Sequence, residues 1–238
     1  MATGSPLLSD SEEVREAFAR QSERWADVSY RSWMPGNLFI HQEGERGWLD
    51  LLRRHDLLPL TERRILDVGC GSGKVLARML LYGAQPENLA GVDLLEDEVE
   101  RARRLTPHVE FRVGDATQLP FDEETFDLAL AFTMFTSMRT DEARQRAADE
   151  VRRVLKPGGA LLWYDFWVNP RNADVKPLGL RDIRRLFPDS EIDARRITLA
   201  PPVARRLAGV SWLACSLLDA VPLLRTHWLA LIRLKPST

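Results

Sequence analysis

The sequence predicts an α/β protein built on a doubly wound, mostly parallel sheet, with helical additions that cap it. Two observations lead to this prediction. From residue 63 onward, short apolar segments alternate with amphipathic helical segments, a pattern typical of a parallel sheet with helices on both faces. Residues 1–60 and 200–225 depart from this alternation and contain helical patterns instead. The length of 238 residues suits one such domain with room for a cap.

The alternating block supplies most of the predicted sheet. Each expected strand is a short run of apolar residues, and glycines follow the first one. Apolar residues at helical spacing fill several of the segments between strands. We expect strands at residues 63–68, 89–93, 109–113, 126–132 and 159–166, and helices at 75–83, 95–105 and 141–155.

The N-terminal block contains no convincing strand pattern. Ser9 or Ser11 can cap a helix over residues 11–28, and a second helix is expected at residues 41–55. Between them, residues 35–37 (Pro-Gly-Asn) are a turn signal. We therefore expect residues 1–60 to form a helical lid and residues 61–238 to form the main domain. Four aromatic residues of this block indicate either an apolar substrate surface or packing of the lid onto the domain: Trp25, Tyr30, Trp33 and Phe39.

Composition narrows the function class. The formal net charge is -2, from 33 basic and 35 acidic side chains, which removes the electrostatic case for a nucleic-acid binder. Cys70 and Cys215 are the two cysteines, too few for a disulfide scaffold. The chain opens without a basic segment followed by an apolar run, so no signal peptide is evident and we expect a cytoplasmic location.

A glycine-rich segment lies where the first strand turns into a helix. Glycines at positions 69, 71 and 73 let the backbone approach a ligand and leave helix N–H groups free for its polar atoms. Asp93 stands twenty residues after Gly73, at the end of the next strand, where an acid can accept hydrogen bonds from both hydroxyls of a ribose. The two features indicate an adenosine-containing ligand. The glycine spacing does not match a dinucleotide-binding loop, because position 74 is Lys.

Five motifs in order make this sequence resemble the class I S-adenosylmethionine (SAM) dependent methyltransferases. Within that family it is most similar to the small-molecule branch known as methyltransferase type 11. The resemblance implies a seven-stranded sheet whose last strand runs antiparallel, with SAM as cofactor and S-adenosylhomocysteine as product. The matching segments are ILDVGCGSGKV at 65–75, GVDLLEDEVERAR at 91–103, VGDATQLPF at 113–121, FDLALAFTMF at 126–135 and EVRRVLKPGGALLWYDF at 150–166.

The resemblance carries over residue by residue to a cofactor site. Asp67 and the loop from Gly69 to Gly73 match the cradle of the methionine moiety; within that loop, Cys70 is expected to be a small buried filler rather than a nucleophile. Asp93 matches the ribose acid and Leu94 the apolar contact beside adenine. The residues expected to hold SAM are Asp67, Gly69, Cys70, Gly71, Gly73, Asp93, Leu94, Asp115 and Ala116 (the last two at the adenine ring), and Phe132 and Thr133, where donor and acceptor meet.

The C-terminal block contains an insertion. A short helix is expected at 179–187, a strand at 191–199 and the last strand at 226–234. If the last strand is antiparallel, both ends of the segment 200–225 lie on the cofactor face, and the segment should sit over the pocket. Residues 207–224 are apolar but interrupted by Asp219 and Pro222, too short a run for a membrane span. Their amphipathic pattern favours a packed cap helix, with a dimer or membrane-surface helix as the alternative.

These observations predict a SAM-dependent methyltransferase that acts on a small-molecule acceptor, at a hydroxyl oxygen. N- or C-methylation and a non-catalytic SAM-binding subunit are the alternatives, and we expect a monomer or homodimer with no metal site. Asp165, at the end of a strand, and His227, at the start of the last strand, are the candidate general bases. A structural histidine is the competing interpretation of His227.

Overall fold

The computed structural model describes residues 15–16, 31–169, 172 and 174–235. Its centre is a seven-stranded sheet in the order β3-β2-β1-β4-β5-β7-β6. All neighbouring strands are parallel except at β7, which runs antiparallel to both β5 and β6. The predicted sheet is therefore confirmed. Its strands are β1 (Ile65–Val68), β2 (Leu89–Asp93), β3 (Glu110–Val113), β4 (Phe126–Phe132), β5 (Leu155–Phe166), β6 (Glu191–Leu199) and β7 (Arg225–Arg233).

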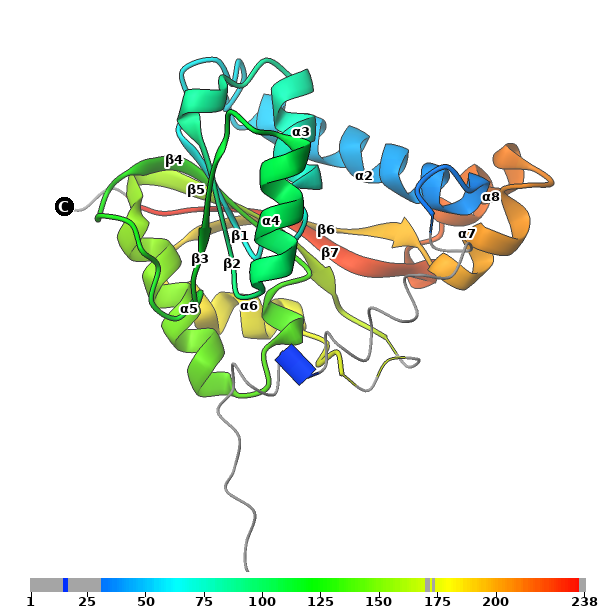
Figure 1. The fold of residues 1–238 in the computed structure, drawn as a ribbon. Coiled ribbons are helices and arrows are strands. Elements are labelled where there is room, and N and C mark those ends of the chain that lie inside the picture. Colours follow the sequence, from blue (N-terminus) through cyan, green and yellow to red (C-terminus); the bar gives the residue numbers. More distant parts are fainter. Residues whose placement is uncertain (1–14, 17–30, 170–171, 173, 236–238) are drawn as a thin grey trace, which may run out of the picture.

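Helices cover both faces of this sheet (Figure 1). On one face, apolar side chains of α2 (Pro35–Arg54), α3 (Lys74–Leu81) and α4 (Glu96–Leu105) pack against one set of strand residues. On the other face, α5 (Asp141–Val154) and α6 (Leu180–Leu186) pack against the alternate set. Successive side chains of a strand point to opposite faces, so central strands buried on both sides read as continuous apolar runs.

Two sequence predictions at element ends need correction. Residues 35–37 are the first turn of α2 rather than a separate turn, because Pro35 is the first helical residue, where its missing N–H is no loss. Strand β5 begins at Leu155 rather than at residue 159, since Leu155 takes an extended conformation and pairs with Phe126. The helix expected at residues 11–28 lies outside the described residues, apart from residues 15–16.

The predicted cap helix is two short helices, α7 (Pro201–Leu207) and α8 (Trp212–Asp219). The chain turns between them, and Ser211 begins α8 by accepting a hydrogen bond from the Ala214 N–H at 3.2 Å. A single amphipathic wheel over 207–224 therefore does not apply: Leu217 is exposed, whereas Asp219 is buried and forms an ion pair with Arg225 at 3.2 Å. Within the part of the chain that the structure describes, no helix is long and apolar enough to cross a membrane.

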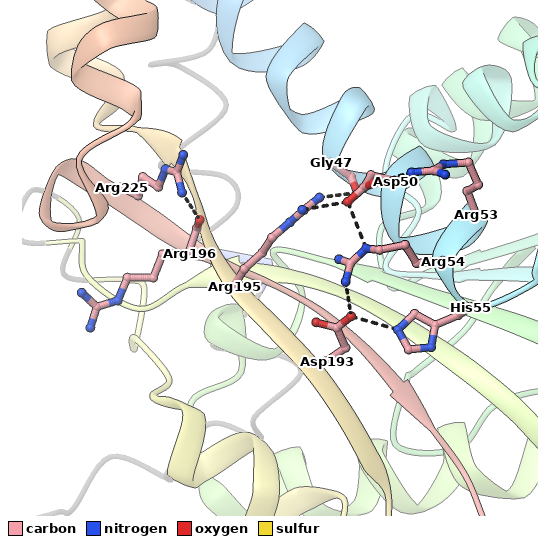
Figure 2. Close-up of polar contacts among 9 residues, drawn as sticks. All are labelled: Gly47, Asp50, Arg53, Arg54, His55, Asp193, Arg195, Arg196 and Arg225. Atoms are coloured by element: carbon pink, nitrogen blue, oxygen red, sulfur yellow. Dashed lines mark hydrogen bonds and ion pairs between the residues drawn. The ribbon is translucent and has the colours of Figure 1, made fainter.

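Polar contacts hold α2 on the edge of the sheet. Arg195 of β6 donates to the Asp50 carboxylate and to the Gly47 carbonyl of α2, each at 2.9 Å (Figure 2). Asp193, also on β6, accepts from Arg54 at 2.8 Å and lies 2.9 Å from the His55 ring. Gly47 allows this close approach, because a Cβ there would lie 2.5 Å from the Ile197 side chain. Helix α2 is thus part of the layer that covers the sheet.

Candidate cofactor site

A cavity at the carboxyl ends of β1, β2 and β4 brings together seven of the eleven residues predicted to hold SAM. Parallel sheets bind ligands at this edge, where strand order reverses on either side of the first strand. The predicted residues that line it are Gly69, Asp93, Leu94, Asp115, Ala116, Phe132 and Thr133. The other four, Asp67, Cys70, Gly71 and Gly73, belong to β1 and its loop but not to the cavity lining.

The glycine loop takes a backbone conformation that few other residues adopt. Gly69, Gly71 and Gly73 have φ of 75°, 49° and 75°, all in the left-handed region. A Cβ at Gly69 would lie 2.8 Å from Met134, and one at Gly73 would lie 3.0 Å from Ala102, so these two glycines permit tight packing. A Cβ at Gly71 would meet nothing closer than 3.9 Å, which leaves its backbone open to a ligand.

Asp93 joins the end of β2 to this loop. Its carboxylate accepts from the Gly71 N–H at 2.8 Å and from the Leu95 N–H at 3.0 Å. Burial raises the pKa of this carboxyl, and the two backbone donors oppose that effect. Each oxygen accepts one of these bonds and keeps acceptor capacity for a further donor. Asp93 therefore lies where a ribose acid is expected, at the wall of the cavity.

Asp67 is a buried carboxyl group near the end of β1 that lacks a partner among the described residues. It is 1% exposed, and within the described part of the chain neither of its carboxylate oxygens has a hydrogen-bond partner. Burial, together with the nearby Asp93, raises the pKa of Asp67 to about 8. An unpaired buried carboxylate is unfavourable, and a cation placed against it would offset much of the desolvation. SAM carries positive charge on its sulfonium and ammonium groups, so a buried carboxyl group beside the glycine loop fits this cofactor.

The adenine end of the predicted site is a short turn after β3. Asp115 accepts from the Thr117 N–H and hydroxyl, both at 2.8 Å, which fixes the carboxylate beside Leu94 and Ala116 in the cavity wall. Across the cavity, Thr133 follows β4 with φ of 56°, an uncommon value for a β-branched residue. Its N–H donates to the Tyr164 carbonyl at 2.7 Å, which holds the turn in place.

The sequence prediction missed the wall that follows Thr133. Met134, Ser137 and Met138 line the cavity from a 3-10 helix, η3 (Phe135–Ser137), and from the residues directly before and after it. No periodic pattern marks such a short turn, and the one available signal was its place directly after a strand that ends at the site. Cys70 is buried in the core, and burial raises the pKa of its thiol, consistent with the expected filler role.

Asp165 is buried and its carboxylate is fully engaged. It accepts from the Thr136 N–H at 3.0 Å, from the Thr136 hydroxyl and from the Phe166 N–H at 2.9 Å. Burial raises the pKa of Asp165 to about 6, although these hydrogen bonds oppose the shift. Since Thr136 lies in η3, these bonds connect the end of β5 to the wall of the cavity.

His227 lies on the opposite face of the sheet from Asp165. It pairs in register with Phe166, and its ring stacks on Tyr164 at 4.5 Å and contacts Phe166 at 4.0 Å. Its Nδ1 lies 3.0 Å from the Thr226 hydroxyl. Burial lowers the pKa of His227 to about 3, so the imidazole is neutral near pH 7. The structure does not bring the two candidate bases together, because adjacent strand residues point to opposite faces.

Comparison with known proteins finds a methyltransferase domain in the part of the chain that contains this cavity. A family model described as "Methyltransferase domain" matches residues 65–159. A demethylmenaquinone methyltransferase of Clavibacter sepedonicus is 36% identical over 115 residues, which cover 47% of this chain and 44% of the relative. A 27-O-demethylrifamycin SV methyltransferase of Amycolatopsis mediterranei is 32% identical over 127 residues, covering 50% of this chain and 45% of the relative. The chain thus matches less than half the length of each of these relatives.

A solved structure shares the fold. The SAM-dependent methyltransferase of Methanosarcina mazei superposes with a TM-score of 0.56 at 20% identity, covering 78% of this chain and 98% of that one. The five ordered motifs, the sheet order with its antiparallel β7, the cavity at the glycine loop and the family match all agree. Residues 65–159 therefore form a methyltransferase domain, which supports the resemblance of the sequence to the class I SAM-dependent methyltransferases.

Proposed function

We propose that this protein transfers the methyl group of SAM to a hydroxyl oxygen of a small, largely apolar acceptor. The observation that carries the proposal is a continuous row of aromatic side chains that starts in the cofactor cavity. Phe132, in the cavity wall, lies 4.7 Å from Trp48 and 5.5 Å from Tyr164, measured between ring centroids. Tyr164 stacks on His227, which contacts Phe166. Trp48 and His227 are buried, whereas Phe132, Tyr164 and Phe166 are half-buried and can contact a flat apolar molecule.

Residues of the cavity and of the adjoining β1 loop would each hold a different part of the cofactor. Asp67 and the loop around Gly71 would receive the charged methionine end, and Asp93 would accept hydrogen bonds from the ribose. Leu94 and Ala116 would enclose the adenine ring, with Asp115 as acceptor for its amino group. When bound, SAM supplies a methyl group already activated by its positive sulfur. The protein then has to orient the acceptor, exclude water and provide for its proton.

Two residues of this row are titratable, and His227 is the better hydrogen-bond acceptor, because burial raises the pKa of the Tyr164 phenol and keeps its proton on. As a neutral imidazole it can accept a hydrogen bond from an acceptor hydroxyl and orient its oxygen. Its low pKa makes it a weak base, so the proposal favours an acidic hydroxyl, such as that of a phenol or enol, over an aliphatic alcohol. We assign Asp165 a lesser part in proton transfer, because three donors already occupy its carboxylate.

The relatives support a small-molecule acceptor by their names: one acts on a demethylmenaquinone and another on 27-O-demethylrifamycin SV. The second name places the methyl group on an oxygen. Methylation at nitrogen or carbon, and SAM binding without turnover in support of a partner, are the competing functions. The lid role of residues 1–60, the cytoplasmic location and the choice between monomer and homodimer stay predictions.

The test is a turnover assay with SAM and a panel of phenols, hydroxyquinones, aliphatic alcohols and amines. We expect release of S-adenosylhomocysteine with acidic hydroxyl compounds, and a mass increase of one methyl group on oxygen in the product. His227→Gln should lower kcat with the SAM dissociation constant nearly unchanged, whereas His108→Gln, at an exposed position, should change neither. Products methylated only at nitrogen or carbon would refute the hydroxyl proposal. SAM binding without turnover on any acceptor would favour the non-catalytic function.

A further inference from the structure

The exposed apolar side chains of the described residues gather on one part of the surface. The described residues include eleven exposed large hydrophobic side chains, and six of these lie between residues 210 and 223, in and around α8. Isolated exposed apolar residues are ordinary, but a cluster of this kind marks an interaction site. The six are Val210, Trp212, Leu213, Leu217, Val221 and Leu223. We call this cluster the α8 patch.

The orientation of α8 on the domain explains why these side chains are exposed to solvent. Cys215 and Asp219 are four residues apart and both buried, so they define the inner side of the helix. Leu213 and Leu217, also four residues apart, are 70% and 65% exposed on the outer side. Val210 precedes the helix, and Val221 and Leu223 follow it. The α7–α8 lobe lies at one end of the molecule, beyond the ends of β6 and β7 (Figure 1).

Two more exposed residues extend the patch onto the start of α2. Trp212 contacts Phe39 edge to face at 5.4 Å, and a Cβ at Gly36 would lie 2.3 Å from Arg205 of α7. The first turns of α2 therefore lie beside this lobe. Leu38 and, just before α2, Trp33 are exposed there. The surface thus combines aliphatic side chains with tryptophan, the residue enriched at membrane interfaces.

The charges around the α8 patch have one sign. Between residues 200 and 224, Asp219 is the single acid, and it is buried against Arg225. Arg206 is exposed and has no ion-pair partner among the described residues, and Arg205 donates to the Asn37 side chain. The rim of the patch is therefore cationic. Basic groups beside exposed leucine and tryptophan are the composition that binds anionic lipid headgroups.

We propose that the α8 patch docks on the surface of an anionic lipid bilayer, with Leu213 and Leu217 inserted and Arg206 facing headgroup phosphates. A second copy of the chain fits less well. A two-fold contact places the same patch on both sides, and this patch offers no exposed acid in residues 200–224 to meet the arginines of its partner. The docking does not depend on the methyl acceptor, so it stands apart from the proposed function.

The experiment measures partition of the full-length chain onto vesicles of phosphatidylcholine alone or mixed with phosphatidylglycerol, by co-sedimentation. We expect binding to the mixed vesicles that weakens with salt. Leu213→Ser combined with Leu217→Ser should lower the partition coefficient roughly 10- to 100-fold. Arg206→Glu should lower it about 10-fold on mixed vesicles and leave the neutral ones unaffected. Leu81→Ser is the matched control, since Leu81 is 82% exposed on α3.

Folding of each variant is checked by circular dichroism and thermal unfolding, and the oligomeric state by light scattering. The proposal is overturned if the full-length chain does not bind the phosphatidylglycerol-containing vesicles, or if the Leu213→Ser, Leu217→Ser double variant binds them as well as the parent. It is also overturned if Leu81→Ser weakens binding equally. A dimer that dissociates in the double variant, without vesicle binding, would assign the α8 patch to a second copy instead.

Discussion

Asp67→Asn should stabilise the ligand-free protein at high pH while it weakens SAM binding. The carboxyl of Asp67 has a pKa of about 8 in the folded chain against an ordinary 3.8. Between these values the unfolded chain has already lost the proton that the folded chain retains. The stability of the native protein therefore falls as pH rises from about 4 and levels off above about 8. Asparagine does not titrate, so Asp67→Asn should not show this fall in stability with rising pH.

The magnitude follows from the two pKa values. Each tenfold step in acidity is worth about 1.4 kcal/mol. From about pH 5 to about pH 9, Asp67 would lower the free energy of unfolding by about 4 kcal/mol. For a chain of this size, 1 kcal/mol moves Tm by about 2–4 °C, so the Tm difference between Asp67→Asn and the parent should change by roughly 8–16 °C over this range. Other titrating groups, including Asp165, are present in both proteins and largely cancel in the difference.

The assay is calorimetric unfolding of both proteins across this pH range, with Asp97→Asn as a control at an exposed acid of α4. Binding of SAM to the parent near pH 7 should also release up to one proton, because a cation favours the ionised carboxylate. Titration in buffers of different ionisation enthalpy measures that proton, and Asp67→Asn should abolish the release. A Tm difference that does not change with pH would refute this account of Asp67.

Three further outcomes are expected. Asp93→Ala should weaken SAM binding about 10- to 30-fold in calorimetry, because two hydrogen bonds of about 1 kcal/mol each are lost; unchanged affinity would remove Asp93 from the site. Gly36→Ala should lower stability by about 1–3 kcal/mol in denaturant unfolding, since its Cβ meets backbone atoms of Arg205, whereas Gly209→Ala, with open space around it, should be nearly neutral. Asp165→Asn should lower stability by about 2–4 kcal/mol and raise the KM for SAM, because it loosens η3. A kcat loss of about 10²-fold or more, with stability and SAM affinity intact, would instead identify Asp165 as the base.

Local signals in the sequence were sufficient for the sheet, and together with the family resemblance they predicted half of the residues that line the cavity. Strands β1, β2 and β4 are short apolar segments of the sequence. Because they are parallel, their carboxyl ends lie at the same edge of the sheet. The glycine loop and Asp93 were recognisable because their spacing reflects a requirement of backbone conformation and of reach. Seven predicted residues consequently line one cavity.

Properties that depend on through-space packing were decided by the tertiary structure. The sequence pattern cannot show that Asp165 faces Thr136 while His227 stacks on Tyr164 across the sheet, because strand direction and face depend on pairing with β7. Nor can it show that the buried Asp67 lacks a hydrogen-bond partner among the described residues, since an absent contact leaves no local pattern in the sequence.

The cap illustrates the same division most clearly. By itself, the sequence determined an apolar insertion before the last strand, with its few charges and its proline. Only the tertiary structure decided that the helix ends after α7 and a second one begins, that Asp219 points inward to Arg225, and that Leu213 and Leu217 face outward. The physical reason is that a helical wheel assumes one continuous helix. Here the turn between α7 and α8 changes the direction in which the side chains of α8 point, and contacts with distant segments determine which side of α8 is buried.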